Sequence, residues 1–232
     1  MPQTQKIFTL RVIVQMVLVV VVFPLLPLLI SGQWGWWQAW AYAILSVLTF
    51  IVSRVLAHRA HPDLIAERAR FMDAKDTKPW DKVLAPLLAF GSVAIVAVAG
   101  VDRLFGWTPG FGIAAHMIAL AFIVIGFAFS SWALIENRFF AGTVRIQTER
   151  GHQVVSTGPY RIVRHPGYAG VMVSYACVPI LLDSFWAFIP TALLGVVLIV
   201  RTLLEDRTLQ AELPGYQEYA RRTRYRLLPG IW

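Results

Sequence analysis

The sequence predicts an all-α integral membrane protein with about six transmembrane segments. Only 15% of its 232 residues are charged and its mean hydropathy is +0.61, whereas roughly a quarter of the residues of an ordinary soluble domain are charged. Apolar runs recur along the chain, and each is close to the roughly 20 residues that a helix needs to cross the hydrocarbon core. The basic residues gather in alternate loops between these runs. A soluble globular domain is therefore excluded.

Four apolar runs are long enough to cross a membrane: about 12–30, 36–57, 83–101 and 111–135. Two further runs, about 168–182 and 185–204, form a tight pair around Asp183 and Ser184. Because the fifth run is short and contains Pro179, we expect it to cross tilted, kinked or only partway, which gives five to six crossings. The first run is too long for the apolar core of a signal peptide, and no small-x-small cleavage site follows it.

The positions of the basic residues predict the orientation. Of the 21 Lys and Arg residues, two precede the first run, seven lie over 54–82, five over 138–164 and six over 201–226. Arg103 is the single basic residue in the loops that alternate with these segments and would lie on the opposite side of the membrane. By the positive-inside rule, both termini and the loops 58–82 and 136–167 are cytoplasmic. Trp107 and Ser184 should then face the exterior, and Lys75 and Gln217 the cytoplasm. The net charge of +8 indicates contact with anionic membrane lipids rather than with nucleic acid.

Several kinds of site are not expected. Cys177 is the single cysteine, which rules out an intrachain disulfide or a cysteine-based metal site. His58 and His61 have a possible ligand spacing but lie in a mixed-charge loop, so no metal is predicted. His116 is alone in an apolar run, where a bond to a neighbouring helix is the simpler interpretation. No Gly-x-Gly-x-x-Gly follows a strand, so a Rossmann-type cofactor site is not expected.

A dense polar and aromatic cluster covers residues 158–170, which read Gly-Pro-Tyr-Arg-Ile-Val-Arg-His-Pro-Gly-Tyr-Ala-Gly. Such groups are costly in a membrane protein and indicate a site. Pro166 suits the first turn of a helix, and the unpaired amides of that turn attract an anion. The alternative is an interfacial loop in which Arg161 and Arg164 snorkel and Tyr160 joins the aromatic belt.

A second polar feature, Arg201 and Glu205, follows a run without charge. The two residues are four apart and share one helical face. They form either a salt bridge where the helix leaves the membrane or a polar pair that faces the 147–168 loop. Arginine placed N-terminal to glutamate is the weaker orientation for an intrahelical pair, which favours the second interpretation.

S-adenosylmethionine fits this set of groups chemically. Its ammonium group needs a carboxylate such as Glu205, and its carboxylate needs donors such as His165 or helix N-terminal amides. A carboxylate-bearing methyl acceptor would use Arg201 for bidentate binding. The residues available as apolar walls for an adenine are Val154, Val155, Tyr160 and Tyr168. A nucleotide or a lipid phosphate would use the same groups, so the residues alone leave these ligands open.

The chain resembles the isoprenylcysteine carboxyl methyltransferase family, which is related to membrane phospholipid methyltransferases. The resemblance rests on Gly158-Pro159-Tyr160-x-x-x-Arg164-His165-Pro166-x-Tyr168-x-Gly170, followed by an apolar hairpin and Arg201-x-x-x-Glu205-Asp206, and it covers about 136–232. It implies a multi-spanning enzyme that uses S-adenosylmethionine to methylate a lipid-linked acceptor at the cytoplasmic face. By motif, Arg201 faces the acceptor, Arg201 and Glu205 are the catalytic residues, and the cofactor contacts are Gln147, His152, Gln153, Val154, Val155, Tyr160, His165, Pro166, Gly167, Tyr168 and Glu205.

The resemblance divides the chain into a scaffold, residues 1–135 with the cytoplasmic loop 58–82, and a methyltransferase region, residues 136–232. That region comprises a cofactor loop, a helical hairpin and a basic tail. Glu205-Asp206-Arg207 stands where eukaryotic members carry a run of glutamates, and the tail 225–232 looks like that of bacterial members. We therefore expect a multi-pass protein of a bacterial inner membrane, whose partners are membrane lipids and a lipophilic small-molecule or lipid-linked acceptor.

A carboxylate acceptor is favoured because a carboxylate is ionised at neutral pH and needs no general base. The first alternative is a phospholipid N-methyltransferase, whose amine acceptor would have to lose a proton. The others, from different classes, are a membrane reductase that uses NAD(P)H and a non-catalytic membrane subunit that retains the fold. Neither a metal nor a nucleic acid is expected in any of these cases.

Overall fold

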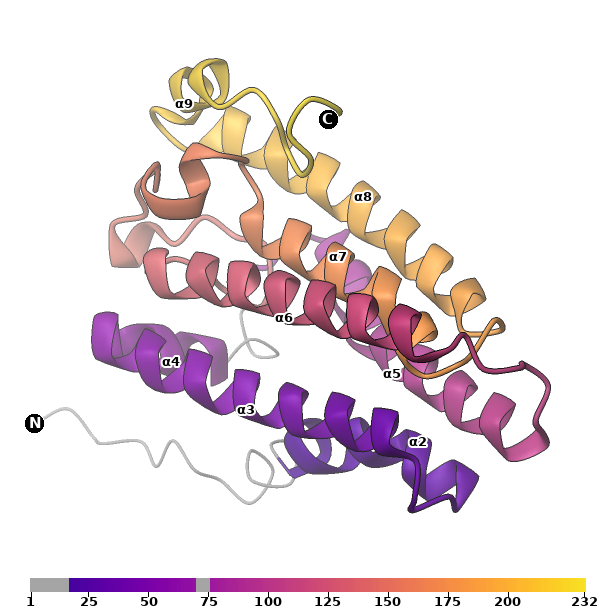
Figure 1. Ribbon diagram of the computed structural model, residues 1–232. Coiled ribbons are helices and arrows are strands. Elements are labelled where there is room, and N and C mark those ends of the chain that lie inside the picture. The colour runs from indigo at the N-terminus through magenta and orange to yellow at the C-terminus, as the bar shows by residue number, and fades with distance from the viewer. Residues whose placement is uncertain (1–16, 70–75) are drawn as a thin grey trace, which may run out of the picture.

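The computed structural model describes residues 17–69 and 76–232, and every regular element within them is a helix (Figure 1). Four helices are long and apolar enough to span a membrane: α3 (Trp37–Ala60), α5 (Asp81–Phe105), α6 (Ile113–Glu136) and α8 (Phe188–Glu212). The shorter apolar segments are the π-helical turn η1 (Leu18–Val22), which continues into α2 (Phe23–Ser31), and α7 (Pro166–Leu181). The prediction of an all-α membrane protein is confirmed. The start of the first predicted run, 12–16, lies outside the described residues.

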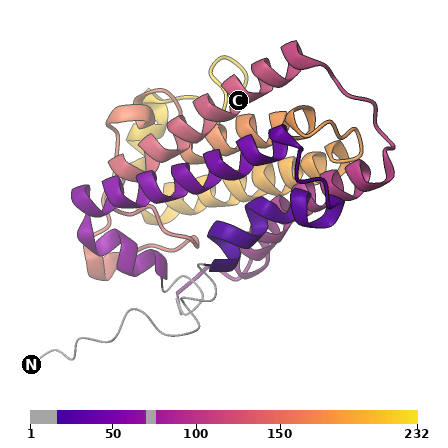
Figure 2. The ribbon, with the colours of Figure 1, turned by 60° about the horizontal axis from the view of Figure 1, so that its bottom comes forward.

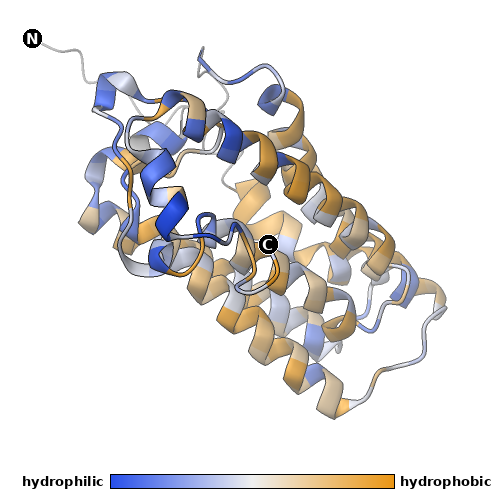
Figure 3. Cartoon of the chain, turned by 90° about the horizontal axis from the view of Figure 1, so that it is seen from above, coloured by the Kyte–Doolittle hydropathy of each residue, from blue (hydrophilic) through white to orange (hydrophobic). Residues whose placement is uncertain are grey.

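The remaining short helices lie at one end of the bundle, on the left in Figure 1. They are α4 (Pro62–Ala69), η3 (Thr148–Arg150), η4 (Gly158–Arg161) and α9 (Tyr216–Arg222). This end contains the segments for which the charge pattern predicts a cytoplasmic location, although residues 70–75 of the predicted loop 58–82 lie outside the described residues. Figure 3 shows the same division, because apolar residues dominate the long helices and hydrophilic residues gather toward this end.

Helices α6 and α7 approach each other closely because glycines meet at their crossing. A Cβ atom on Gly126 would lie 2.5 Å from the carbonyl oxygen of Gly170, and a Cβ on Gly170 would lie 2.7 Å from the backbone nitrogen of Ser130. Small residues allow helix backbones to pack at such distances in a membrane. Gly170, the last residue of the polar cluster, therefore has a packing role. Helix α2 packs against α3 and α5 on the other side of the bundle (Figure 2).

The opposite end of the bundle is held by a buried carboxylate in the α7–α8 turn. His116 Nε2 lies 2.7 Å from Asp183 Oδ1, and the backbone amide of Phe111 donates to the same oxygen at 2.7 Å. The expected partner of His116 was a neighbouring helix, and the structure instead shows a bond to the turn between α7 and α8. The next residue, Ser184, donates to Asp102 Oδ2 at 2.6 Å and is fully buried. The Ser184 hydroxyl is therefore bonded inside the helix bundle and is not accessible from solution, and the side of the membrane on which Ser184 lies stays a prediction.

Large apolar side chains cover the outside of the bundle. Phe90 on α5 and Ile113 on α6 are more than three-fifths exposed, whereas Leu28 and Ile123 inside the bundle have no exposed surface. This arrangement is expected where hydrocarbon, rather than water, surrounds the long helices. Trp34 and Trp37 are exposed at the α2–α3 turn, where aromatic side chains mark a membrane–water interface.

Candidate functional site

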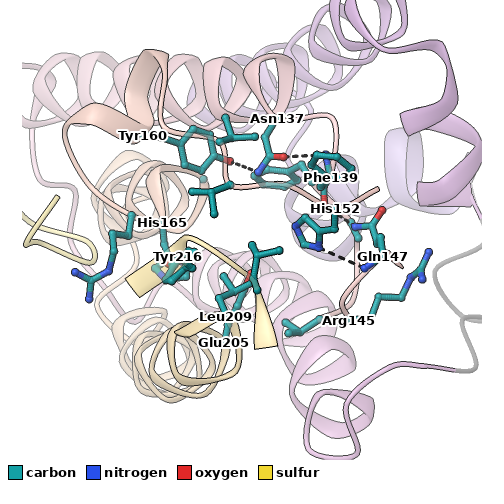
Figure 4. A pocket seen from close by; sticks show the side chains of 18 of the residues that line it. Asn137, Phe139, Arg145, Gln147, His152, Tyr160, His165, Glu205, Leu209 and Tyr216 are labelled. Carbon is teal, nitrogen blue, oxygen red and sulfur yellow. Dashed lines mark hydrogen bonds between the residues drawn. The ribbon is translucent and has the colours of Figure 1, made fainter. Parts of the chain in front are cut away.

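A pocket opens at the end of the bundle that contains α4. Its walls come from the loop between α6 and α7, the start of α7, the end of α8, and α9 (Figure 4). In Figure 4, Asn137, Tyr160 and His152 lie across the pocket from Glu205 and Leu209. Both motifs of the sequence thus contribute to a single pocket.

The pocket brings together nearly all of the predicted cofactor residues. Ten of these eleven residues line it: Gln147, His152, Gln153, Val154, Val155, Tyr160, His165, Gly167, Tyr168 and Glu205. Pro166 does not line it and is instead the first residue of α7, the helical position predicted for it. Arg201 also lines the pocket.

Glu205 has one hydrogen-bond partner in the part of the chain that the structure describes. The Tyr168 hydroxyl donates to its Oε2 atom at 2.5 Å. No Lys, Arg or His among the described residues forms an ion pair with it. The carboxylate therefore faces the pocket without a cationic partner from the described chain, which suits a ligand ammonium group.

Arg201 pairs with a carboxylate that the sequence did not suggest. Its Nε and Nη2 atoms donate to Asp81 at 2.6 and 3.0 Å, and Nη2 also donates to the Gly142 carbonyl oxygen at 3.1 Å. The alternative of a salt bridge between Arg201 and Glu205 is therefore not found, whereas both residues line the pocket together with residues of the 147–168 loop. Spacing places both residues on one face, but the fully buried Asp81 offers two oxygens to the planar guanidinium group, which is the stronger geometry.

Asp206, the last residue of the second motif, joins the motifs to the C-terminal tail. Its oxygens accept from Arg164 at 2.7 and 2.9 Å, from Arg226 at 2.9 Å and from the Tyr216 hydroxyl at 3.1 Å, and its side chain is fully buried. Arg164 is therefore a buried structural cation and does not snorkel, whereas Arg161 is exposed. The tail returns to the first motif, because the Arg164 amide donates to the Tyr225 carbonyl oxygen at 2.9 Å.

His165 precedes α7 at the N-cap position and packs against the pocket. Its ring stacks on that of Tyr168 with centroids 5.8 Å apart and planes 2° apart, and its Nε2 atom lies 3.4 Å from Asp206 Oδ1. The amides of Gly167 and Tyr168 open the helix, where no intrahelical acceptor exists for them. These amides offer the pocket a place for a carboxylate.

The loop between α6 and α7 is held in place by α4. Asp63 accepts from Arg150 at 2.7 Å and Glu67 accepts from Arg145 at 2.7 Å. Burial lowers the pKa of the nearby His152 from 6.5 to about 4, and the positive charges of Arg150 and Arg145 act in the same direction. His152 is therefore neutral at pH 7, and its Nδ1 atom accepts from the Gln147 amide at 3.3 Å.

Several residues that line the pocket were not predicted from the sequence. They are Asn137, Phe139, Arg145, Leu209, Leu213, Tyr216 and Tyr219. A signal for two of them was present, because Leu209 and Leu213 continue the four-residue spacing of Arg201 and Glu205 along α8. The tyrosines of α9 had no such signal, since they reach the site only because the chain turns back after α8.

No metal site emerges within residues 17–69 and 76–232, where no three His, Cys, Asp or Glu side chains come together. A second cavity, of about 470 Å³, lies among the apolar helices and is lined by residues of η1, α2, α3, α4, α5, α6, α7 and α8. Phe140, Gly167, Tyr168 and Arg201 line both this cavity and the pocket of Glu205. A polar pocket and a largely apolar cavity therefore share a wall.

Known proteins resemble the segment that carries this geometry. Residues 117–211 match the isoprenylcysteine carboxyl methyltransferase family. Two rice proteins, from Oryza sativa subsp. indica and subsp. japonica, are each named "Probable protein-S-isoprenylcysteine O-methyltransferase", and each is 33% identical to this chain over 57 residues, which is 24% of this chain and 30% of the relative. The chain thus aligns with less than a third of the length of these relatives. The resemblance carried by the two motifs is confirmed, because the match to the isoprenylcysteine carboxyl methyltransferase family covers residues 117–211 and so includes the 147–168 loop and Glu205.

Proposed function

We propose that the protein is an S-adenosylmethionine-dependent methyltransferase that methylates a lipophilic acceptor at the cytoplasmic face of the membrane. The observation that carries the proposal is the wall shared by two cavities. The pocket on one side contains the carboxylate of Glu205, and the cavity on the other side is lined largely by apolar helix surfaces. A polar donor and a lipophilic acceptor would meet at Tyr168 and Arg201.

The residues of the pocket fit S-adenosylmethionine. Glu205 would bind the ammonium group, and the first amides of α7, with His165, would bind the carboxylate. The adenine would lie among the apolar side chains of Val154, Val155 and Leu209. When bound, this cofactor would supply a methyl group on a sulfonium sulfur, and the carbon–sulfur bond would break as the acceptor atom bonds to the methyl carbon, leaving a neutral thioether.

The protein's own contribution is to position the reactants and to exclude water. Tyr168 holds Glu205 in one orientation through its 2.5 Å hydrogen bond, and Asp81 holds Arg201 at the shared wall. A carboxylate acceptor is already ionised at neutral pH, so no proton has to be removed before the transfer. Alignment of the reacting atoms at about 3–3.5 Å accounts for the catalysis that such a site requires.

The orientation in the membrane is part of the proposal. The end of the bundle that contains α4, α9 and the cofactor pocket would face the cytoplasm, together with both termini, in a bacterial inner membrane. Support comes from the basic residues, which lie mostly in segments of this end, whereas Arg103 lies at the other. Basic residues accumulate on the cytoplasmic side of membrane proteins.

A binding measurement tests the cofactor assignment. Calorimetry on the detergent-solubilised protein should detect S-adenosylhomocysteine but not NADPH. Glu205→Gln and His165→Ala should each weaken that binding roughly ten- to hundredfold, because one charge-assisted contact contributes about 1.5–3 kcal/mol. Glu212→Gln is the matched control, since Glu212 lies on the same helix but is 44% exposed and pairs with Lys78.

Four results would each contradict a part of the proposal. Binding of NADPH in place of S-adenosylhomocysteine would favour the reductase alternative, and binding of neither would favour the non-catalytic subunit. Equal affinity of Glu205→Gln and Glu212→Gln would remove Glu205 from the cofactor site. Methyl transfer from labelled S-adenosylmethionine to phosphatidylethanolamine, but not to lipophilic carboxylic acids, would identify the N-methyltransferase instead.

A further inference from the structure

Two arginines line the cavity among the apolar helices, here called the membrane cavity. Arg54 lies on α3 and Arg68 on α4, and both side chains are half-buried. Arg54 Nη1 donates to the Ser53 hydroxyl at 3.2 Å, and its guanidinium carbon lies 4.6 Å from the centroid of the Phe50 ring. Arg68 Nη1 donates to the Phe140 carbonyl oxygen at 2.9 Å. Each arginine thus bonds one neutral oxygen of the described chain.

The other half-buried or buried arginines of this end have carboxylate partners. Arg145 pairs with Glu67, Arg150 with Asp63, Arg164 with Asp206 and Arg201 with Asp81. Among residues 17–69 and 76–232, no carboxylate pairs with Arg54 or Arg68. A guanidinium group that is withdrawn from water without a counterion is expensive, particularly within a membrane. The two arginines therefore form a cationic pair whose counterion would be a bound anion.

The charges of the membrane cavity act on one another. Burial lowers the pKa of Arg68 to about 9, and the positive charges of Arg54 and Arg201 act in the same direction. The carboxylate of Asp81 is already bonded to Arg201 and to the Val144 amide. A bound anion would neutralise this excess of positive charge, whereas an ammonium group would increase it.

The arginines also lie close to the place where methyl transfer is proposed. Arg68 bonds to the backbone of Phe140, and its guanidinium carbon lies 5.4 Å from the Phe140 ring. Phe140 lines both the membrane cavity and the cofactor pocket, as do Tyr168 and Arg201. An anion held by Arg54 and Arg68 would therefore lie beside the shared wall.

We propose that Arg54 and Arg68 bind the carboxylate of a single-chain lipophilic acceptor and so determine the specificity of the methyl transfer. The chain of this acceptor would lie among the apolar helices, against side chains such as Val19, Phe23 and Leu88. The cavity volume of about 470 Å³ is within the range of roughly 300–1,000 Å³ that holds one drug-sized ligand. As an assignment of the acceptor, the proposal rests on the proposed function.

The test compares two probes that differ in charge alone. S-farnesylthiopropionic acid and its primary amide, both tritiated, are bound at equilibrium to the full-length protein in detergent micelles. The acid should bind at least tenfold more tightly than the amide. Arg54→Gln and Arg68→Gln should each abolish most of that difference while the affinity for the amide stays constant. Arg59→Gln, an exposed site on α3, is the matched control and should change neither affinity.

Equal binding of acid and amide to the wild-type protein would overturn the proposal, as would an effect of Arg59→Gln equal to that of the two cavity variants. Displacement of the acid by phosphatidylglycerol at the concentration at which unlabelled acid displaces it would reassign the arginines to a phospholipid and overturn the acceptor assignment. Binding of S-adenosylhomocysteine is measured on the same samples. If it is absent while the acid still depends on Arg54 and Arg68, the proposed function fails and the anion site stands.

Discussion

Replacing Asp81 with Asn should destabilise the protein far more than an equivalent change at the surface. Asp81 has no exposed surface, accepts from Arg201 at 2.6 and 3.0 Å, and accepts from the Val144 amide at 2.6 Å. Asn keeps one acceptor oxygen but leaves the buried guanidinium group of Arg201 without a counterion. Removal of one partner from a buried ion pair costs about 3–5 kcal/mol, so we expect the free energy of unfolding to fall by about that amount.

The assay is equilibrium unfolding in mixed detergent micelles, followed by tryptophan fluorescence. Asp63→Asn is the matched control, because the Asp63 side chain is 40% exposed and pairs with Arg138 and Arg150. An exposed ion pair contributes about 0–1 kcal/mol. A double-mutant cycle with Arg201→Met should show a coupling of at least about 1 kcal/mol between positions 81 and 201. Equal losses for Asp81→Asn and Asp63→Asn, or additivity in the cycle, would refute the assignment of a stabilising ion pair.

Two further predictions concern orientation and pH. With Cys177 replaced by Ala, an impermeant thiol reagent applied to intact cells should label Trp107→Cys but not Gln217→Cys, both of which are at exposed positions. The reverse labelling pattern would invert the orientation. Ser184 and Lys75 are not used, because Ser184 is buried and Lys75 lies outside the described residues. The pKa of His152 is lowered from 6.5 to about 4 in the folded protein. The stability that the neutral His152 contributes to the folded loop is therefore fully present above pH 6.5. This contribution, at most roughly 3 kcal/mol, is lost as the pH falls toward 4. The protection factors of the amides in residues 147–155, which correct for the intrinsic exchange rate at each pH, should fall over that interval, and an equal fall in His152→Gln would contradict this cause.

Local features of the site could be predicted from the sequence because their causes are local. The polar cluster predicted both a loop and the start of a helix, and Pro166 begins α7 as expected. The four-residue spacing of Arg201 and Glu205 placed both on the pocket-facing side of α8, and both line the pocket. In each case the backbone geometry of one helix determines where the side chain points.

The partners of the charged groups could not be predicted in the same way. Asp81 precedes Arg201 by 120 residues, and in the sequence it looks like a solvated residue at the edge of a cytoplasmic loop. Asp206 likewise collects Arg164 and Arg226 from distant segments. Helical periodicity specifies a face but not the element that covers it. Pairing between residues that are far apart in the sequence depends on how the helices pack, and this packing cannot be predicted from any single segment.

These pairings also bear on the division of the chain at residue 135. The N-terminal helices were expected to be scaffold, yet α5 contributes Asp81, the ion-pair partner of Arg201 at the shared wall, and α3 and α4 contribute Arg54 and Arg68 to the membrane cavity. The family match covers 117–211 and so contains most of the residues that line the pocket of Glu205, but neither Arg54 nor Arg68. If the acceptor binds as proposed, the part of the chain outside the match selects the acceptor, and the part inside it binds the methyl donor. Relatives with the same second half would then differ in acceptor through substitutions in α3 and α4.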